Sequence, residues 1–137
     1  MNRGFCYRAR MVAGQQDDPV SIAVRFNDGI NAKDLDALAR SMTDDHVFID
    51  SAGGRVEGRQ DCLAAWRGFF LAYPDYRNEF ASLVLASAGT MAITGRSVCS
   101  EPALDGPALW TARIREGRVC EWRVYEDTPA TRALIGV

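Results

Sequence analysis

The first half of the chain has its apolar residues at the spacing of amphipathic helices. From Val20 to Ile30 they recur every three or four positions, which is the period of one helix face. Asp18 followed by Pro19 is typical of a helix start, and Asp34 begins a second segment of the same kind. The pattern predicts three helices, at about residues 19–31, 34–42 and 59–73.

The second half of the chain alternates apolar and polar residues, as strands with one buried face do. Four strands are expected there, followed by a last helical turn: residues 77–86, 90–100, 109–116, 118–126 and 129–136. Between the second and third helices we expect a turn at residues 43–45 and a short strand at residues 46–50. A hairpin partner for this strand is expected at residues 56–57. The short connections favour an antiparallel meander. Helices followed by a long sheet predict an α+β domain, with the helices on one face of a curved antiparallel sheet.

Alternation also assigns the two faces of the last strands. The residues expected to face the helices are Trp110, Ala112, Ile114, Cys120, Trp122, Val124 and Glu126. The residues expected on the outer face are Leu109, Arg113, Arg115, Glu121, Arg123, Tyr125 and Asp127. This outer surface mixes both signs of charge with apolar groups, so pairing with a second copy predicts a homodimer.

Composition is that of a globular protein with one domain. The 137 residues are 47% hydrophobic and 25% charged. Residues 18–137 are expected to form the domain and residues 1–17 a flexible extension, with Met11 as an alternative start. The net charge of −2 argues against a nucleic-acid partner. The sequence has no signal peptide or spanning segment, so we expect a cytoplasmic protein without a membrane partner.

No cofactor or metal motif occurs in the sequence, and we expect neither group. There is no glycine-rich dinucleotide or phosphate loop, and the four cysteines lack the spacing of a metal knuckle. His46 is the single histidine and is expected to be exposed and uninvolved. Three of the cysteines lie in apolar segments and are expected in the core: Cys62, Cys99 and Cys120.

Four segments together resemble the SnoaL-like polyketide cyclases. They are FNDGINAKDLD at 26–36, TDDHVFID at 43–50, VEGR at 56–59 and EGRVCEWRVYED at 116–127. The similarity covers about residues 18–130, in the right order. That group is part of the nuclear transport factor 2-like superfamily, with ketosteroid isomerase and limonene epoxide hydrolase. The resemblance implies a cone-shaped curved sheet, with three N-terminal helices packed on its concave face around a deep apolar pocket.

Asp50 is the candidate catalytic residue. The resemblance places it at the position of the proton-transferring base of ketosteroid isomerase. It also ends a strand on the same face as Phe48, so its carboxylate would enter an aromatic pocket that raises its basicity. The alternative is that Asp50 caps the turn at residues 51–55, which is common for Asp before Ser and Gly.

The other positions of the resemblance depart from the known catalysts. Phe26 and Trp110 stand where the isomerase has its oxyanion donors, and Val124 stands where the cyclases have an acid. Glu126 and Arg96 are candidates for a second acid or an orienting group, with a solvated strand end and a surface charge as their respective alternatives. The expected pocket residues are Phe26, Phe48, Trp66, Phe70, Trp110, Trp122 and Val124.

Three functions remain open at this point. The first is a cofactor-free isomerase, cyclase or dehydratase-type lyase that acts on a small hydrophobic carbonyl compound with Asp50 as acid–base group. The second is a domain of the same fold that binds a small hydrophobic ligand without chemistry. The third is a dimeric interaction module without a working pocket.

Overall fold

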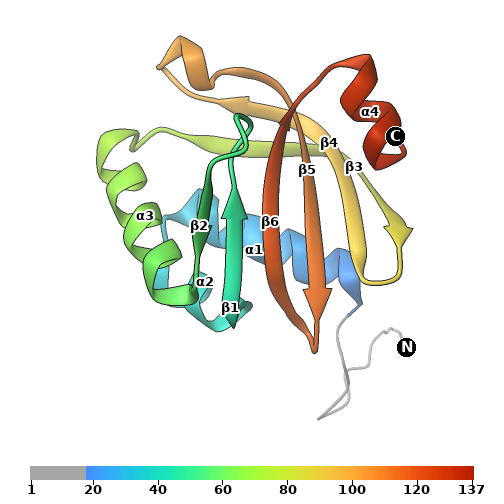
Figure 1. Ribbon diagram of the computed structural model, residues 1–137. Helices are drawn as coiled ribbons and strands as arrows, with labels where there is room; N and C mark the ends of the chain where they lie inside the picture. The colour runs from blue at the N-terminus through green and yellow to red at the C-terminus, as the bar shows by residue number, and fades with distance from the viewer. Residues whose placement is uncertain (1–17) are drawn as a thin grey trace, which may run out of the picture.

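The computed structural model describes residues 18–137, which form helices packed on a curved sheet of six strands (Figure 1). The expected extension at residues 1–17 lies outside the described residues. In chain order the elements are α1 (Pro19–Ala32), α2 (Leu35–Ser41), β1 (Met42–Ile49), β2 (Arg55–Glu57), α3 (Arg59–Ala72), β3 (Arg77–Ser87), β4 (Thr90–Val98), η1 (Pro102–Leu104), β5 (Gly106–Arg115), β6 (Arg118–Glu126) and α4 (Pro129–Ile135). The predicted α+β class with a curved sheet is confirmed.

The first two helices begin and end where their local sequence predicts. The Asp18 carboxylate accepts the Ser21 amide at 2.8 Å, and the Asp34 carboxylate accepts the Ala37 amide at 3.0 Å. Lys33 ends α1 in the left-handed conformation, with φ of 57°. The buried side of α1 is shifted from the predicted one. Val20 and Val24 are exposed, and the apolar residues that enter the core are Ile22, Ala23, Phe26 and Ile30.

The order of strands in the sheet is β2-β1-β6-β5-β4-β3. All neighbours are antiparallel except β1 and β6, which run parallel. The expectation of a wholly antiparallel sheet is therefore wrong at this one seam. No hairpin joins β1 to β6, so their direction is set by the intervening helix and meander rather than by a tight turn.

A second difference concerns residues 43–45, which were expected to form a turn. They lie inside β1, which follows α2 directly, and the pairing of β1 with β6 shifts between Met42 and Val47. Asp44 and Asp45 are exposed at this irregularity while Thr43 is buried. The irregular register lets two carboxylates reach water without ending the strand.

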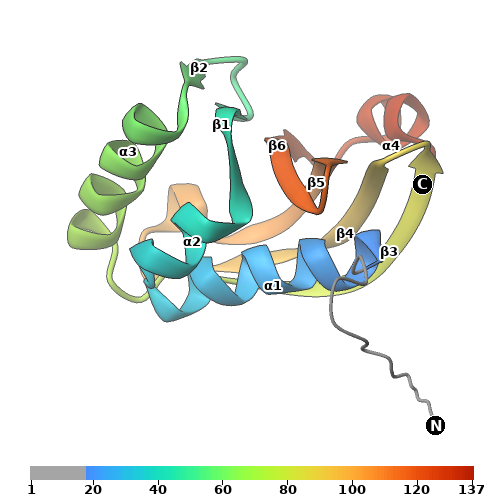
Figure 2. The same ribbon diagram turned by 90° about the horizontal axis from the view of Figure 1, so that it is seen from below.

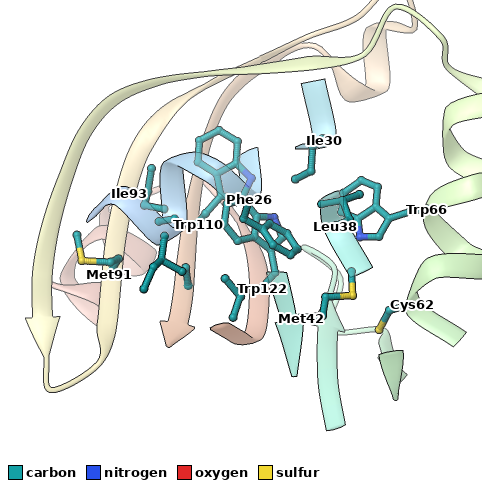
Figure 3. Close-up of a cluster of buried hydrophobic side chains, with 14 of the residues drawn as sticks. Phe26, Ile30, Leu38, Met42, Cys62, Trp66, Met91, Ile93, Trp110 and Trp122 are labelled. Carbon is teal, nitrogen blue, oxygen red and sulfur yellow. The ribbon is translucent and has the colours of Figure 1, made fainter. Parts of the chain in front are cut away.

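Helices α1, α2 and α3 lie on one side of the sheet and α4 lies on the other (Figures 1 and 2). The main core fills the space beneath α1, where Phe26 packs on Trp122 with ring centroids 4.7 Å apart (Figure 3). Trp110 and Trp122 are both fully buried in this core. Trp122 and Val124 face the helices and Tyr125 faces the opposite side, as alternation predicts for β6.

One residue of β6 breaks the predicted alternation. Arg113 pairs with Glu121, but the next residue, Ile114, pairs with Val119, so Cys120 is the extra residue of a β-bulge. The bulge puts Val119 in the main core in place of Cys120. Cys120 is buried, but it does not belong to that core.

The outer face of the sheet is partly covered by α4. Leu109 and Ala92 are fully buried there, against Ile135 of the helix. Leu109 is therefore absent from the exposed surface that was expected to pair with a second copy. Within residues 18–137, no helix has the length and apolar character needed to span a membrane.

Candidate functional site

A cavity of about 310 Å³ lies between α3 and the end of the sheet formed by β1, β2 and β6. Helix α3 contributes Cys62, Ala65, Trp66 and Phe69 to its wall. The strands contribute Phe48, Val56, Trp122 and Val124, and the remaining lining residues are Asp50, Ser51, Tyr76 and Leu104. Asp50 and Ser51 are exposed, so the loop after β1 lies where the cavity meets the solvent.

Trp66 is the centre of the aromatic wall. Phe48 and Phe69 meet its ring edge-on at 5.5 and 5.8 Å, and Phe70 stacks on it at 5.4 Å. These contacts hold the indole in place, and its Nε1 is buried without a hydrogen-bond partner among the described residues. A ring fixed in this way can pack against a flat apolar molecule with little loss of side-chain entropy.

The structure separates the expected pocket residues into two groups. Phe48, Trp66, Trp122 and Val124 line the cavity, as does Asp50. Phe26, Phe70 and Trp110 do not line it and belong to the packed core, where Phe26 and Trp110 are fully buried. Helix α1 packs against the sheet near Trp110, whereas the cavity lies beside α3.

Asp50 caps the turn that follows β1. Its Oδ1 accepts the backbone amides of Ala52 at 2.9 Å and Gly54 at 2.8 Å, and its side chain is exposed. Gly54 permits this arrangement, since a Cβ there would lie 2.6 Å from Asp50 Oδ2. Of the two interpretations that the sequence leaves open, the geometry matches the turn cap. The carboxylate borders the cavity from its solvent side and is not enclosed by aromatic rings.

Glu126 and Arg96 do not join Asp50. Both side chains are exposed and neither lines the cavity. Arg96 Nη2 lies 3.7 Å from Asp105 Oδ2 on the surface, and Glu126 ends β6. Arg96 therefore matches the alternative of a surface charge, and Glu126 matches the alternative of a solvated strand end.

His46 is fully buried, contrary to the expectation that it is exposed. Its Nδ1 lies 2.7 Å from the Val119 carbonyl, which can only accept, so Nδ1 carries the proton. Nε2 has no partner within the described chain, and the ring stacks on Phe26 at 5.5 Å. Burial lowers the pKa of the imidazole despite the bond to Val119. The ring sits at the β1–β6 seam and does not line the cavity.

Tyr76 lines the cavity, although sequence reasoning did not select it. The side chain is 7% exposed, packs edge-on against Phe69 at 4.8 Å, and has its hydroxyl 3.2 Å from Ser97 Oγ. Burial raises the pKa of this phenol. Alternation could have indicated it, because Tyr76, Asn78 and Phe80 share a side at the start of β3.

Cys62 is the one thiol in the lining of the cavity, and its surroundings do not activate it as a nucleophile. Cys62 directs Sγ at the carbonyls of Val56 and His46, at 3.4 and 3.6 Å, and burial raises the pKa of its thiol. Across residues 18–137, no group of three or more His, Cys, Asp or Glu side chains has the arrangement of a metal site. The lining of the cavity is therefore mostly apolar, and Asp50 is its one carboxylate, at the solvent edge.

Comparison with known proteins extends these observations. The sequence model of the SnoaL-like domain matches residues 23–122. No curated protein matches the sequence significantly.

Solved structures with the same fold include the "putative polyketide cyclase" SMa1630 from Sinorhizobium meliloti, with a TM-score of 0.69 and 19% identity over 79% of this chain and 99% of that one. They include IdmH, a "putative polyketide cyclase" from Streptomyces antibioticus, with a TM-score of 0.65 and 18% identity over 88% of this chain and 100% of that one. A "putative ketosteroid isomerase" from Kribbella flavida has a TM-score of 0.64 and 18% identity over 85% of this chain and 86% of that one. At these identities the likeness shows the fold alone.

Proposed function

This chain belongs to the SnoaL-like domain family, and from that premise we propose that it binds a small apolar molecule in the cavity beside α3. The observation that carries the proposal is the wall of fixed aromatic rings around about 310 Å³ of space. Pockets of roughly 300–1,000 Å³ that are mostly apolar are typical of small-molecule sites. A flat ligand of about the size of naphthalene suits this volume.

Filling the cavity tests the proposal. Ala65 lines it from α3, so Ala65→Phe would occupy the space of a ligand. Ala64 is its neighbour on the same helix, is exposed and does not line the cavity, so Ala64→Phe is the matched control. We expect 2-naphthol to quench the fluorescence of Trp66 and Trp122 in the unchanged protein and in the control, but not in Ala65→Phe. Equal binding by both variants would contradict the proposal.

A second candidate function is proton transfer next to a carbonyl group. Asp50 supports it as the one carboxylate at the edge of the cavity, and solved structures of the same fold are named as putative polyketide cyclases and a putative ketosteroid isomerase. In this step the Asp50 carboxylate takes the proton from the carbon beside the carbonyl. The electron pair moves onto the oxygen as an enolate, and a proton then returns to the carbon.

Exchange of 2-tetralone α-protons for deuterium, followed by NMR, tests this second function. Asp50→Asn keeps an oxygen that can accept the amides of Ala52 and Gly54, so the turn survives while the base is removed. We expect the variant to lose protein-catalysed exchange and to keep its affinity for 2-naphthol. Unchanged exchange would assign Asp50 to the turn alone.

A further inference from the structure

A line of four polar side chains runs from the cavity wall to α1 through an otherwise apolar core. It consists of Tyr76, Ser97, Asn78 and Asn27, each no more than 7% exposed. Of these four, Tyr76 alone lines the cavity. Buried polar side chains that are fully connected in this way have defined donor and acceptor roles.

A backbone carbonyl sets the direction of every bond in the line. Asn27 approaches the carbonyl oxygen of Asn78 at 3.3 Å, and since that oxygen only accepts, the atom of Asn27 there is the amide nitrogen. The oxygen of Asn27 then accepts from Asn78 Nδ2 at 3.2 Å, which leaves Asn78 Oδ1 as an acceptor. Asn31 holds the same backbone from its own side chain, donating to the Asn78 carbonyl and accepting the Asn78 amide, both at 2.9 Å.

The remaining two bonds follow from the number of protons available. Ser97 Oγ lies 2.8 Å from Asn78 Oδ1 and donates its single proton there. Its 3.2 Å contact with Tyr76 is then a bond that the tyrosine hydroxyl donates. The proton of Tyr76 is thereby committed to Ser97. The Asn78 side chain also interacts with the Tyr76 oxygen and offsets part of the effect of burial on the phenol pKa. A hydroxyl oxygen has two lone pairs, so it can still accept one more bond.

We propose that Tyr76 makes the cavity selective for ligands that carry a hydroxyl or N–H donor, in preference to ligands that offer only an acceptor such as an ether or a carbonyl. This rests on the proposed function, namely that the cavity binds an apolar molecule. A ligand that carries a donor gains a bond to the Tyr76 oxygen without breaking the bond from Tyr76 to Ser97. A ligand that offers only an acceptor gains a bond only if the Tyr76 hydroxyl gives up its bond to Ser97. The raised pKa keeps the phenol neutral, so its proton stays in the line.

Binding of two probes to two variants tests the selectivity. The probes are 2-naphthol, which carries a donor, and 2-methoxynaphthalene, which has the same rings and only an acceptor. Tyr76→Phe removes the accepting oxygen. Tyr73→Phe is the matched control, because Tyr73 packs on the same Phe69 ring at 5.1 Å but does not line the cavity. Tryptophan fluorescence gives the dissociation constant of each probe.

We expect the preference for 2-naphthol, measured as the ratio of the two dissociation constants, to fall about three- to tenfold in Tyr76→Phe, the value of one neutral hydrogen bond. Tyr73→Phe should leave the ratio unchanged. Ser97→Ala is an independent test, since it frees the Tyr76 proton. There the ratio should fall because 2-methoxynaphthalene binds more tightly, which general loosening of the core would not produce.

The outcomes distinguish this inference from the function on which it rests. If both probes bind and neither Tyr76→Phe nor Ser97→Ala changes their ratio, the role of Tyr76 is overturned while the cavity remains a binding site. If neither probe binds the unchanged protein, both proposals are overturned. If Tyr76→Phe fails to fold, the response of Ser97→Ala to 2-methoxynaphthalene decides for or against the inference.

Discussion

Among single residues, His46 makes the stability of this protein sensitive to mild acid. Its imidazole is fully buried, stacked on Phe26, and has its pKa lowered by burial. In the unfolded chain the pKa returns to about 6.5. The unfolded state therefore binds a proton that the folded state excludes, so the free energy of unfolding falls as the pH decreases below about 6.5 and is unaffected above it.

Urea unfolding at pH 7.5 and pH 5 measures this effect. Between the unfolded pKa and the lowered pKa of the folded state, we expect a loss approaching about 1.4 kcal/mol for each pH unit. His46→Asn retains an N–H for the Val119 carbonyl but cannot take up a proton, so its stability should vary little between these pH values. The carboxyl groups whose pKa is lowered by hydrogen bonds, those of Asp45, Asp75 and Asp127, titrate well below this window. An equal pH slope in both proteins would contradict the prediction.

Truncation of Trp122 should strongly destabilise the core. It is fully buried and packs on Phe26 at 4.7 Å and on Phe80 at 6.2 Å. Trp122→Ala should reduce the free energy of unfolding by about 3–5 kcal/mol, because the cavity left behind cannot collapse under α1. Leu134→Ala is the control, since Leu134 is 72% exposed and should change stability by less than about 0.5 kcal/mol. Chemical denaturation measures both, and similar small losses would mean that Trp122 is not a central core residue.

At the level of secondary structure, a glycine inside α3 lowers the stability of the helix. Gly68 lies within this helix, is exposed, and has open space where a Cβ would stand. Gly68→Ala should raise the free energy of unfolding by about 0.5–1 kcal/mol, because alanine has less backbone freedom to lose on folding. Gly58→Ala, at the start of the same helix, should be destabilising, since Gly58 has φ of 94°. Thermal unfolding of both variants checks the pair, and a lower melting temperature for Gly68→Ala would contradict it.

For the whole molecule, we propose self-association through the part of the outer sheet face that α4 leaves uncovered. Arg113 is exposed there, and its Nη2 lies 3.6 Å from Glu121 Oε1. Together the two side chains present charges of both signs to a second copy. Sedimentation velocity should then give twice the chain mass of 15.1 kDa at micromolar concentration. Arg113→Glu should weaken the dimer. Arg67→Glu makes the same change at an exposed position on α3, away from this face, and should not weaken it. A monomer under these conditions would contradict the proposal.

Local features were predictable because neighbouring residues determine them. The caps at Asp18 and Asp34 and the alternation that buries Trp110 and Trp122 need no knowledge of distant segments. At the site, the same alternation placed Phe48, Trp122 and Val124 toward the helices, and they line the cavity. Neither periodicity nor the resemblance could tell a cavity wall from a filled core, so Phe26, Phe70 and Trp110 were grouped with them although they belong to the packed core.

Tertiary structure alone decided the features that join segments far apart in the chain. The parallel β1–β6 seam buries His46 by pairing it with a carbonyl 73 residues away. A bulge at Cys120 puts Val119 in the core in place of Cys120, while the rest of β6 keeps the predicted faces, and no strict period of two can foresee this change. The line from Tyr76 to Asn27 joins β3, β4 and α1, and its donors and acceptors acquire a direction only when a backbone carbonyl 51 residues from Asn27 is in place. Hydrogen bonds of this kind depend on the distance between segments, and pattern along the chain carries no information about that distance.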